Sequence, residues 1–264
     1  MTVSAAYPWH SAIWHRLTDT VAQNRLPHAL LLAGPAGGGK RQFARALAAY
    51  LLCSDTNGQH SACGQCRACT LIAAQTHPDT NWVLPEENSR AIKIDQIRQL
   101  SDLMQKTSQL GGKKIVIIEP AETMNINAAN ALLKNLEEPR PDTYLILISD
   151  APGKLLPTIR SRCMKFLFPT PPLDQSSRWL ATHLPSNVSS ERLLQLAGGQ
   201  PVAALGLYES GALNIRDTLQ EIWIALWQRQ RDCFSVAAQW MAFEPVDVLQ
   251  WAEIWLQDAI RSNF

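Results

Sequence analysis

The chain has 264 residues, of which 46% are hydrophobic and 18% are charged, a composition typical of a globular protein with a sizeable core. Its 24 Lys and Arg and 23 Asp and Glu residues give a formal net charge of +1, which excludes nucleic-acid binding through a strong overall positive charge. The sequence has no signal-peptide pattern and no apolar stretch of the roughly 18 residues that a transmembrane helix needs, so we expect a cytoplasmic protein that does not enter a membrane.

Short apolar runs alternate with helical patterns up to residue 168. The runs are continuously apolar, as is typical of strands covered on both faces, and strand–helix alternation predicts a parallel α/β sheet. The five predicted strands are HALLLAG (28–34), TNWVLP (80–85), KIVIIEP (114–120), YLILIS (144–149) and MKFLF (164–168).

Between these runs, apolar residues recur at helical spacing and predict three amphipathic helices. Their stripes are Phe43, Ala44, Leu47, Ala48 and Leu51; then Ile94, Ile97, Leu100 and Met104; then Met124, Ala128, Leu132 and Leu136.

The character of the sequence changes at a proline-rich break, PTPPLDQ (169–175), after which only helical patterns follow. A second break, ESGALN (209–214), precedes a tryptophan-rich helical tail. We therefore predict three domains: an α/β domain over 1–168, a small helical domain over 169–208 and a helical domain over 209–264.

The stretch GPAGGGK has the spacing of a phosphate-binding loop, Gly34-x4-Gly39-Lys40, between a predicted strand and a predicted helix. Arg41 follows where such loops carry the Ser or Thr that holds Mg²⁺, and a guanidinium has no lone pair for a metal. The third run ends in Glu119-Pro120 rather than in two carboxylates, so no side chain is left to orient an attacking water. We expect ATP to be either not bound or not hydrolysed. The alternative is a glycine-rich turn without any ligand.

Four cysteines, Cys53, Cys63, Cys66 and Cys69, have the spacing C-x9-C-x2-C-x2-C. Four thiolates satisfy tetrahedral Zn²⁺ and leave no open position, so the pattern predicts a structural zinc site in an insertion over 53–69. The alternative is four incidental cysteines, some joined by disulfides. The two remaining cysteines, Cys163 and Cys233, are predicted to be small core residues rather than ligands.

Arg162 stands in the frame SRC, just before the last predicted strand. An arginine there can point at a nucleotide on a neighbouring subunit and stabilise charge on its γ-phosphate. The alternative is a basic loop that contacts only solvent.

Taken together, HALLLAGPAGGGK, the cysteine cluster, NAANALLKNLEEP (127–139), LPTIRSRC (156–163) and AGGQPVAAL (197–205) resemble the delta-prime subunits of bacterial DNA polymerase III clamp loaders, which belong to the AAA+ family. The resemblance runs from about residue 5 to about residue 210. It implies a five-stranded parallel sheet with a zinc insertion, a helical lid and an all-α collar domain, here shortened or incomplete.

The resemblance also implies a function. Such a subunit is the non-hydrolysing, stator-like member of a heteropentameric ATPase that places a sliding clamp on primed DNA. It is not an enzyme alone, and its partners are motor subunits of the gamma/tau type and the delta subunit. By the same resemblance, the four cysteines are zinc ligands, Arg162 is a finger on the neighbour's ATP, and Ser149 holds the position that senses the γ-phosphate. The lid arginine of active relatives is absent, since Pro201 and Val202 follow the glycine turn.

Two other functions stay open: a weakly active ATPase motor subunit of the same loader, and a zinc-dependent DNA-binding module. Direct contact with DNA would require a local basic surface, and residues 90–114 supply the only candidate that we single out. Its basic residues are Arg90, Lys93, Arg98, Lys106, Lys113 and Lys114.

Overall fold

The computed structural model describes residues 6–56, 60–87, 89–245, 248–249, 251–253 and 255, without the side chains of residues 214 and 227. All five predicted strands are present. They are β1 (Ala29–Ala33), β2 (Thr80–Val83), β3 (Lys114–Ile118), β4 (Thr143–Ser149) and β5 (Met164–Leu167).

The helices in the part of the chain that the structure describes include the three predicted stripes, except that Met124 of the third stripe lies before α5. In chain order they are α1 (Ser11–Ala22), α2 (Lys40–Leu52), α3 (Arg67–Ala73), α4 (Ile94–Gln105), α5 (Ile126–Glu137), α6 (Pro157–Arg160), α7 (Leu173–Ala181), α8 (Ser190–Leu196), α9 (Pro201–Glu209), α10 (Ala212–Trp227) and α11 (Cys233–Trp240). Three short 3-10 helices are η1 (Pro8–His10), η2 (Ala121–Thr123) and η3 (Pro152–Lys154).

The strands form one parallel sheet in the order β2-β3-β4-β1-β5. All strands point the same way, so the segments that follow β1, β3 and β4 meet at one edge of the sheet, where α/β proteins form their binding crevice. The predicted phosphate loop therefore lies beside the ends of β3 and β4.

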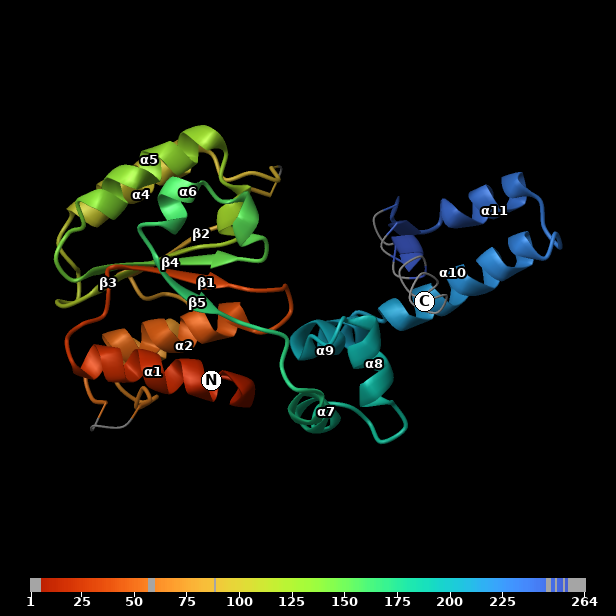
Figure 1. Cartoon of the computed structure of the whole chain (residues 1–264), viewed down its shortest axis with the longest axis horizontal. Helices are drawn as coiled ribbons and strands as arrows, with labels where there is room; N and C mark the ends of the chain where they lie inside the picture. The colour runs from red at the N-terminus through yellow and green to blue at the C-terminus, as the bar shows by residue number, and fades with distance from the viewer. Residues whose placement is uncertain are drawn as a thin grey trace. The chain divides into compact units, whose positions relative to one another are not determined.

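The two faces of the sheet are buried under different helices (Figure 1). Leu30 and Leu32 of β1 pack with residues of α1 and α2, whereas Leu31 packs with residues of α4 and α5. Every residue of β1 is fully buried. This explains why the predicted strands are apolar on both sides rather than alternating.

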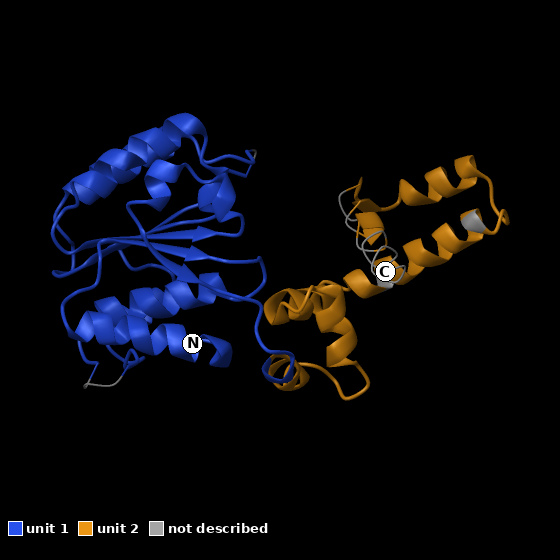
Figure 2. Ribbon diagram, in the orientation of Figure 1, with its two compact units in different colours: residues 1–175 blue, residues 176–264 orange. Residues whose placement is uncertain are grey.

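The chain divides into two compact units, Met1–Gln175 and Ser176–Phe264 (Figure 2). In the second unit, α8 and α9 enclose a small core with Leu180, Leu193, Leu194 and Ala204. The division of this unit into a lid and a collar stays a prediction. The described helices also include none that is both long and apolar enough to cross a membrane.

The structure corrects two details of the helical region. The predicted break at 209–214 is only two residues long, because α9 ends at Glu209 and α10 begins at Ala212. Cys163 is buried as predicted, but Cys233 is exposed. It opens α11 directly after the capping residue Asp232, at a helix end that faces solvent.

Candidate functional site

The phosphate loop has the backbone shape that its glycines predict. A Cβ at Gly34 would lie 2.0 Å from the carbonyl oxygen of Phe168, so only glycine fits between β1 and the segment after β5. Gly39 caps α2 with a φ of 95°, in the left-handed region that glycine favours. The chain thus keeps the strand–loop–helix junction of a nucleotide-binding protein.

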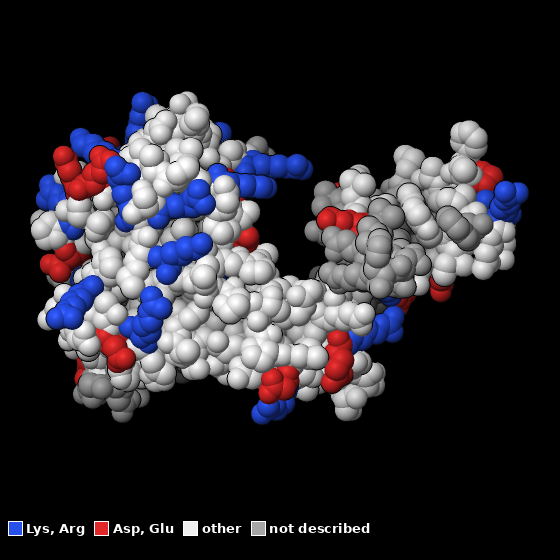
Figure 3. Space-filling view, in the orientation of Figure 1, with Lys and Arg blue, Asp and Glu red and all other residues white. Residues whose placement is uncertain are grey.

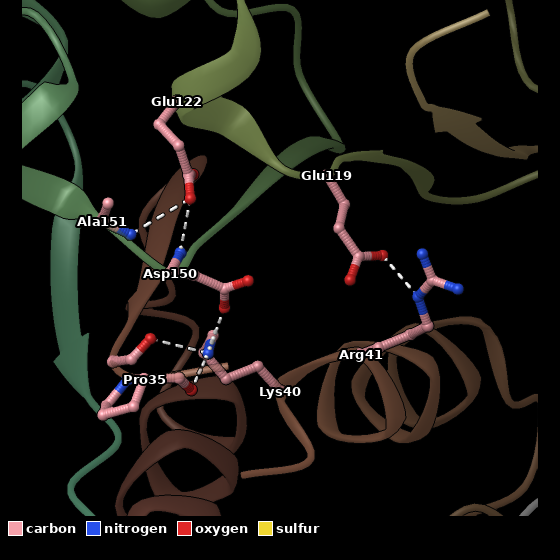
Figure 4. A network of polar contacts seen from close by, with 8 residues as sticks. Pro35, Lys40, Arg41, Glu119, Glu122, Asp150 and Ala151 are labelled. Atoms are coloured by element: carbon pink, nitrogen blue, oxygen red, sulfur yellow. Dashed lines mark hydrogen bonds and ion pairs between the residues drawn. The ribbon is translucent and has the colours of Figure 1, made fainter. Parts of the chain in front are cut away.

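Lys40, however, is turned into its own loop (Figure 4). Its ammonium donates to the carbonyl oxygens of Gly34 at 2.7 Å and Pro35 at 2.6 Å, and it forms an ion pair of 2.6 Å with Asp150. An ammonium has three N–H donors, and these three acceptors account for all of them. The carboxylate of Asp150 is therefore the anion that pairs with Lys40 in this structure.

Glu122 of η2 holds Asp150 in position directly after β4. One carboxylate oxygen of Glu122 accepts hydrogen bonds from the backbone N–H groups of Asp150 at 2.9 Å and Ala151 at 3.1 Å (Figure 4). The neighbouring Ser149 is fully buried, and its hydroxyl has no hydrogen-bond partner among the described residues. Its backbone carbonyl oxygen accepts from the N–H of Gly34 at 3.2 Å, so Ser149 lies beside the loop, and its predicted role as a γ-phosphate sensor stays a proposal.

Arg41 pairs with the carboxylate that ends β3. Its Nε donates to Glu119 Oε2 at 2.7 Å (Figure 4), and its guanidinium lies 6.0 Å from the ring centre of Trp82. Burial raises the pKa of Glu119, and the adjacent Arg41 opposes that shift. The residue that replaces the metal-binding hydroxyl thus engages the carboxylate that a metal would need.

An aromatic segment at the N-terminus covers the loop, and the sequence analysis missed it. The indole N–H of Trp9 donates to the carbonyl oxygen of Gly38 at 2.9 Å, and Tyr7 stacks on Trp9 with ring centres 4.7 Å apart. A Cβ at Gly39 would come within 2.4 Å of the Tyr7 ring. Three aromatic residues within YPWH, ahead of a phosphate loop, are the signal that could have indicated this contact.

His10 of this segment is buried between Phe43 and Phe168, with ring centres 5.6 and 4.8 Å away. Burial lowers the pKa of His10 from 6.5 to about 4, and the nearby charge of Lys40 adds to the effect. Folding therefore favours the neutral ring.

This shift predicts a loss of stability in acid. The contribution of neutral His10 is complete above pH 6.5 and is lost as the pH falls towards 4, because the unfolded chain takes up the proton first. Between pH 7.5 and 5, we expect the unfolding free energy of the wild-type chain to fall by about 2 kcal/mol more than that of His10→Phe. Urea denaturation of both proteins at the two pH values measures the difference. Equal decreases in both proteins would contradict the assignment.

The four predicted zinc ligands come together as one cluster. The Sγ atoms of Cys53, Cys63, Cys66 and Cys69 all lie within 4.8 Å of one another, and no disulfide joins them. Two of these separations, at 3.9 and 4.0 Å, are close to the ~3.8 Å that separates sulfurs bound tetrahedrally at ~2.3 Å from Zn²⁺. This geometry favours a shared metal ion over four incidental cysteines.

The surroundings of the cluster fit a metal-bound thiolate site. The backbone N–H groups of Cys63 and Cys66 each point at a cysteine sulfur, at 3.3 Å, as donors to thiolates do. Burial raises the pKa of Cys53 and Cys69, so these sulfurs need a cation beside them to be thiolates at neutral pH. A zinc ion held by these four residues would supply that charge and cross-link the insertion.

Arg162 lies at the surface between α6 and β5. Its side chain is 36% exposed, forms an ion pair of 2.7 Å with Glu137 and donates to the carbonyl oxygen of Thr158 at 3.0 Å. The guanidinium is thus accessible from outside and held at the C-terminal end of α5.

The predicted basic surface over 90–114 is less basic in the folded chain than in the sequence. Lys93 and Arg98 are each paired with a carboxylate, at 2.7 and 3.2 Å. Lys114 is buried, with its ammonium on backbone carbonyl oxygens. On the visible face of the first unit, basic and acidic side chains are interspersed (Figure 3). The structure therefore gives this run no special support as a DNA contact.

Comparison with known proteins agrees with these features. Residues 9–172 match the family described as "DNA polymerase III, delta subunit". The protein named DNA polymerase III subunit delta' from Pseudomonas aeruginosa is 44% identical over 257 residues, which cover 97% of this chain and 77% of that protein. This chain belongs to the DNA polymerase III delta' family.

Other relatives extend the comparison. The protein named DNA polymerase III subunit delta' from Escherichia coli is 34% identical, over 97% of this chain and 77% of that protein. Among solved structures, a gamma subunit-related protein of Thermotoga maritima shares 20% identity with a TM-score of 0.48, and this chain covers 62% of its length. Family membership confirms the resemblance drawn from the motifs. The predicted five-stranded parallel sheet, the four-cysteine insertion and the helical C-terminal region are present as well.

Proposed function

We propose that this chain is the non-hydrolysing, stator-like subunit of a clamp loader within the DNA polymerase III holoenzyme. It joins gamma/tau-type motor subunits and a delta subunit in a cytoplasmic, replisome-bound complex that loads a sliding clamp on primed DNA. The polypeptide contributes to an ATPase without being one itself.

One observation carries the non-hydrolysing part: the ammonium of Lys40 already binds three acceptors of its own chain. A γ-phosphate would have to displace Asp150, and Arg41 offers no hydroxyl for Mg²⁺. Tyr7 and Trp9 pack against the same loop. These contacts favour a structural role for the loop rather than a role in ATP hydrolysis.

A second set of contacts supports the proposed role of Arg162 as an arginine finger. Arg162 is exposed, is permanently charged and is held by two surface acceptors that another anion can replace. We propose that it acts on a nucleotide bound by the next subunit rather than on its own loop. The four-cysteine cluster, with structural zinc, then stabilises the domain that presents this arginine.

Replacing Lys40 tests whether the phosphate loop has only a structural role. We expect Lys40→Ala to lower the unfolding free energy by about 1–3 kcal/mol, because two part-buried carbonyl oxygens lose their donor and a buried side chain is truncated. The ATPase of the reconstituted loader should stay within about twofold of wild type, because no nucleotide depends on Lys40. Urea denaturation and steady-state phosphate release measure the two effects.

Two controls sharpen this test. Lys40→Met keeps the apolar stem of the side chain, so it separates lost packing from lost charge. The purified wild-type chain is incubated alone with Mg-ATP. Two results would contradict the proposal: hydrolysis above background by that chain, or a tenfold loss of loader ATPase in a stable Lys40→Met variant. Either result would show that the loop acts on a nucleotide and that this chain is a motor subunit.

A further inference from the structure

A pocket of about 390 Å³ lies against the cysteine cluster, away from the phosphate loop. The helix α2 separates the two places: it begins at the loop with Lys40 and ends beside the pocket with Leu52, about 18 Å further on for 13 residues. The pocket also lies before β3, at the opposite edge of the sheet from the segments that surround Lys40. None of the functions proposed above uses it.

The pocket combines an apolar wall with two cations. Leu51, Leu52 and Leu110 line the wall, and Arg67 and Lys113 line the same pocket from two different segments of the chain. None of the lining residues, all of which the structure describes, is acidic.

No carboxylate of the described residues neutralises these two cations. Neither Arg67 nor Lys113 has an ion pair or a side-chain hydrogen bond within the described ranges, whereas Arg41, Lys93 and Arg98 each pair with a carboxylate. Two unpaired positive charges beside an apolar wall favour a ligand that carries negative charge.

The wall is held in place before any ligand binds. The carboxylate of Asp79, which is 1% exposed, accepts hydrogen bonds from the backbone N–H groups of Gln109 at 2.7 Å and Leu110 at 3.0 Å. Gly111 and Gly112 then turn the chain with φ values of 75° and 105°. A Cβ at either glycine would meet no atom within 4 Å, so the backbone conformation rather than space requires glycine. This turn places Lys113 at the pocket and lowers the entropic cost of binding there.

We infer that this pocket binds an acidic peptide segment of a partner protein. An apolar side chain of the peptide packs against Leu51, Leu52 and Leu110, and its carboxylates pair with Arg67 and Lys113. Single-stranded nucleic acid fits less well, because two cations cannot follow a phosphate backbone and the lining has no Phe, Tyr or Trp on which bases stack.

The probe is a fluorescein-labelled peptide, Glu-Glu-Leu-Leu-Glu-Glu, capped at both ends and titrated with the full chain at low salt. We expect saturable fluorescence anisotropy, which the double variant Arg67→Glu/Lys113→Glu weakens at least tenfold. The double variant Arg25→Glu/Lys154→Glu changes two exposed cations elsewhere and lowers the net charge equally, so it should stay within twofold of wild type.

Three further measurements distinguish a peptide site from a nonspecific charge effect and from a nucleic-acid site. Peptides with Gln for Glu, or with Ser for Leu, should each bind at least fivefold more weakly. An oligothymidylate should not compete with the peptide. Equal binding of the Ser peptide, competition by the oligonucleotide, an equal loss in both double variants, or no binding at millimolar peptide would each overturn the proposal.

Arg67 follows the predicted ligand Cys66, so its charge could instead serve the metal site. Zinc content distinguishes the two roles: we expect the Arg67→Glu/Lys113→Glu variant to keep the zinc content of wild type. Loss of zinc would assign Arg67 to the metal centre and overturn the proposal. The neutral variant Arg67→Gln/Lys113→Gln repeats the titration if the charge reversal unfolds the chain, with an expected loss of at least threefold.

Discussion

Replacing Arg162 by alanine is expected to slow ATP hydrolysis at the neighbouring subunit's site by about 10³-fold or more, while the loader still assembles. In the proposed finger role, the guanidinium stabilises the charge that develops on the transferred phosphoryl group, and alanine leaves nothing in its place. Single-turnover phosphate release by the reconstituted complex, with clamp and primed DNA present, measures the rate. Size-exclusion chromatography checks that the subunits remain together.

The contacts of Arg162 in this structure explain how it could change partner at little cost. Its ion pair with Glu137 joins two half-exposed side chains, and such pairs contribute only about 0–1 kcal/mol. A phosphate in an interface from which water is excluded binds a guanidinium more strongly, through two parallel hydrogen bonds. In the proposed role, Arg162 therefore exchanges Glu137 for the phosphate of the neighbouring subunit at little cost.

Two matched variants make the test specific. Arg160, at the end of α6, is an exposed arginine two residues before Arg162, so Arg160→Ala should leave hydrolysis within about twofold of wild type. Glu137→Gln removes the resting partner and should keep hydrolysis at or above the wild-type rate. If Arg162→Ala hydrolyses ATP as fast as Arg160→Ala does, the finger role is wrong.

The parts of the fold that the sequence predicts are those set by local patterns. Continuous apolar runs predict β1 to β5 because each strand is covered on both faces, and the spacing of Cys53 to Cys69 predicts a cluster because short gaps turn successive sulfurs inward. In both cases the residue types within one short segment are enough to predict the feature, although the groups that cover the strands are distant in sequence.

The contacts that decide the chemistry of the loop could not be predicted in this way. Asp150 and Lys40 are 110 positions apart, and Tyr7 reaches Gly39 from a segment whose sequence has no helical or strand period. These contacts depend on which strands are neighbours, which no local pattern encodes. The wrong prediction for Cys233 has a similar cause, because an apolar residue at a helix end can face either solvent or core.

The second large effect concerns the metal. We expect Cys66→Ser to weaken zinc binding by more than about 100-fold, since losing a direct ligand costs more than losing a residue that only supports one. Serine stays neutral at pH 7 and its oxygen is a poor substitute for a soft thiolate. A 100-fold weaker affinity corresponds to about 2.7 kcal/mol of zinc-linked stability. Elemental analysis after dialysis against a chelator should find one zinc per wild-type chain and almost none in the variant.

The same chain supplies the control for this prediction. Cys233 is exposed and lies in the second unit, so Cys233→Ser removes a thiol without touching the cluster and should keep one zinc per chain. Proteolysis then reports the structural consequence, because α3 begins directly after Cys66 and should become susceptible to cleavage only in Cys66→Ser. Full zinc content in Cys66→Ser would show that three cysteines suffice and that the fourth position is open to another ligand, which would change the site from a structural to a reactive one.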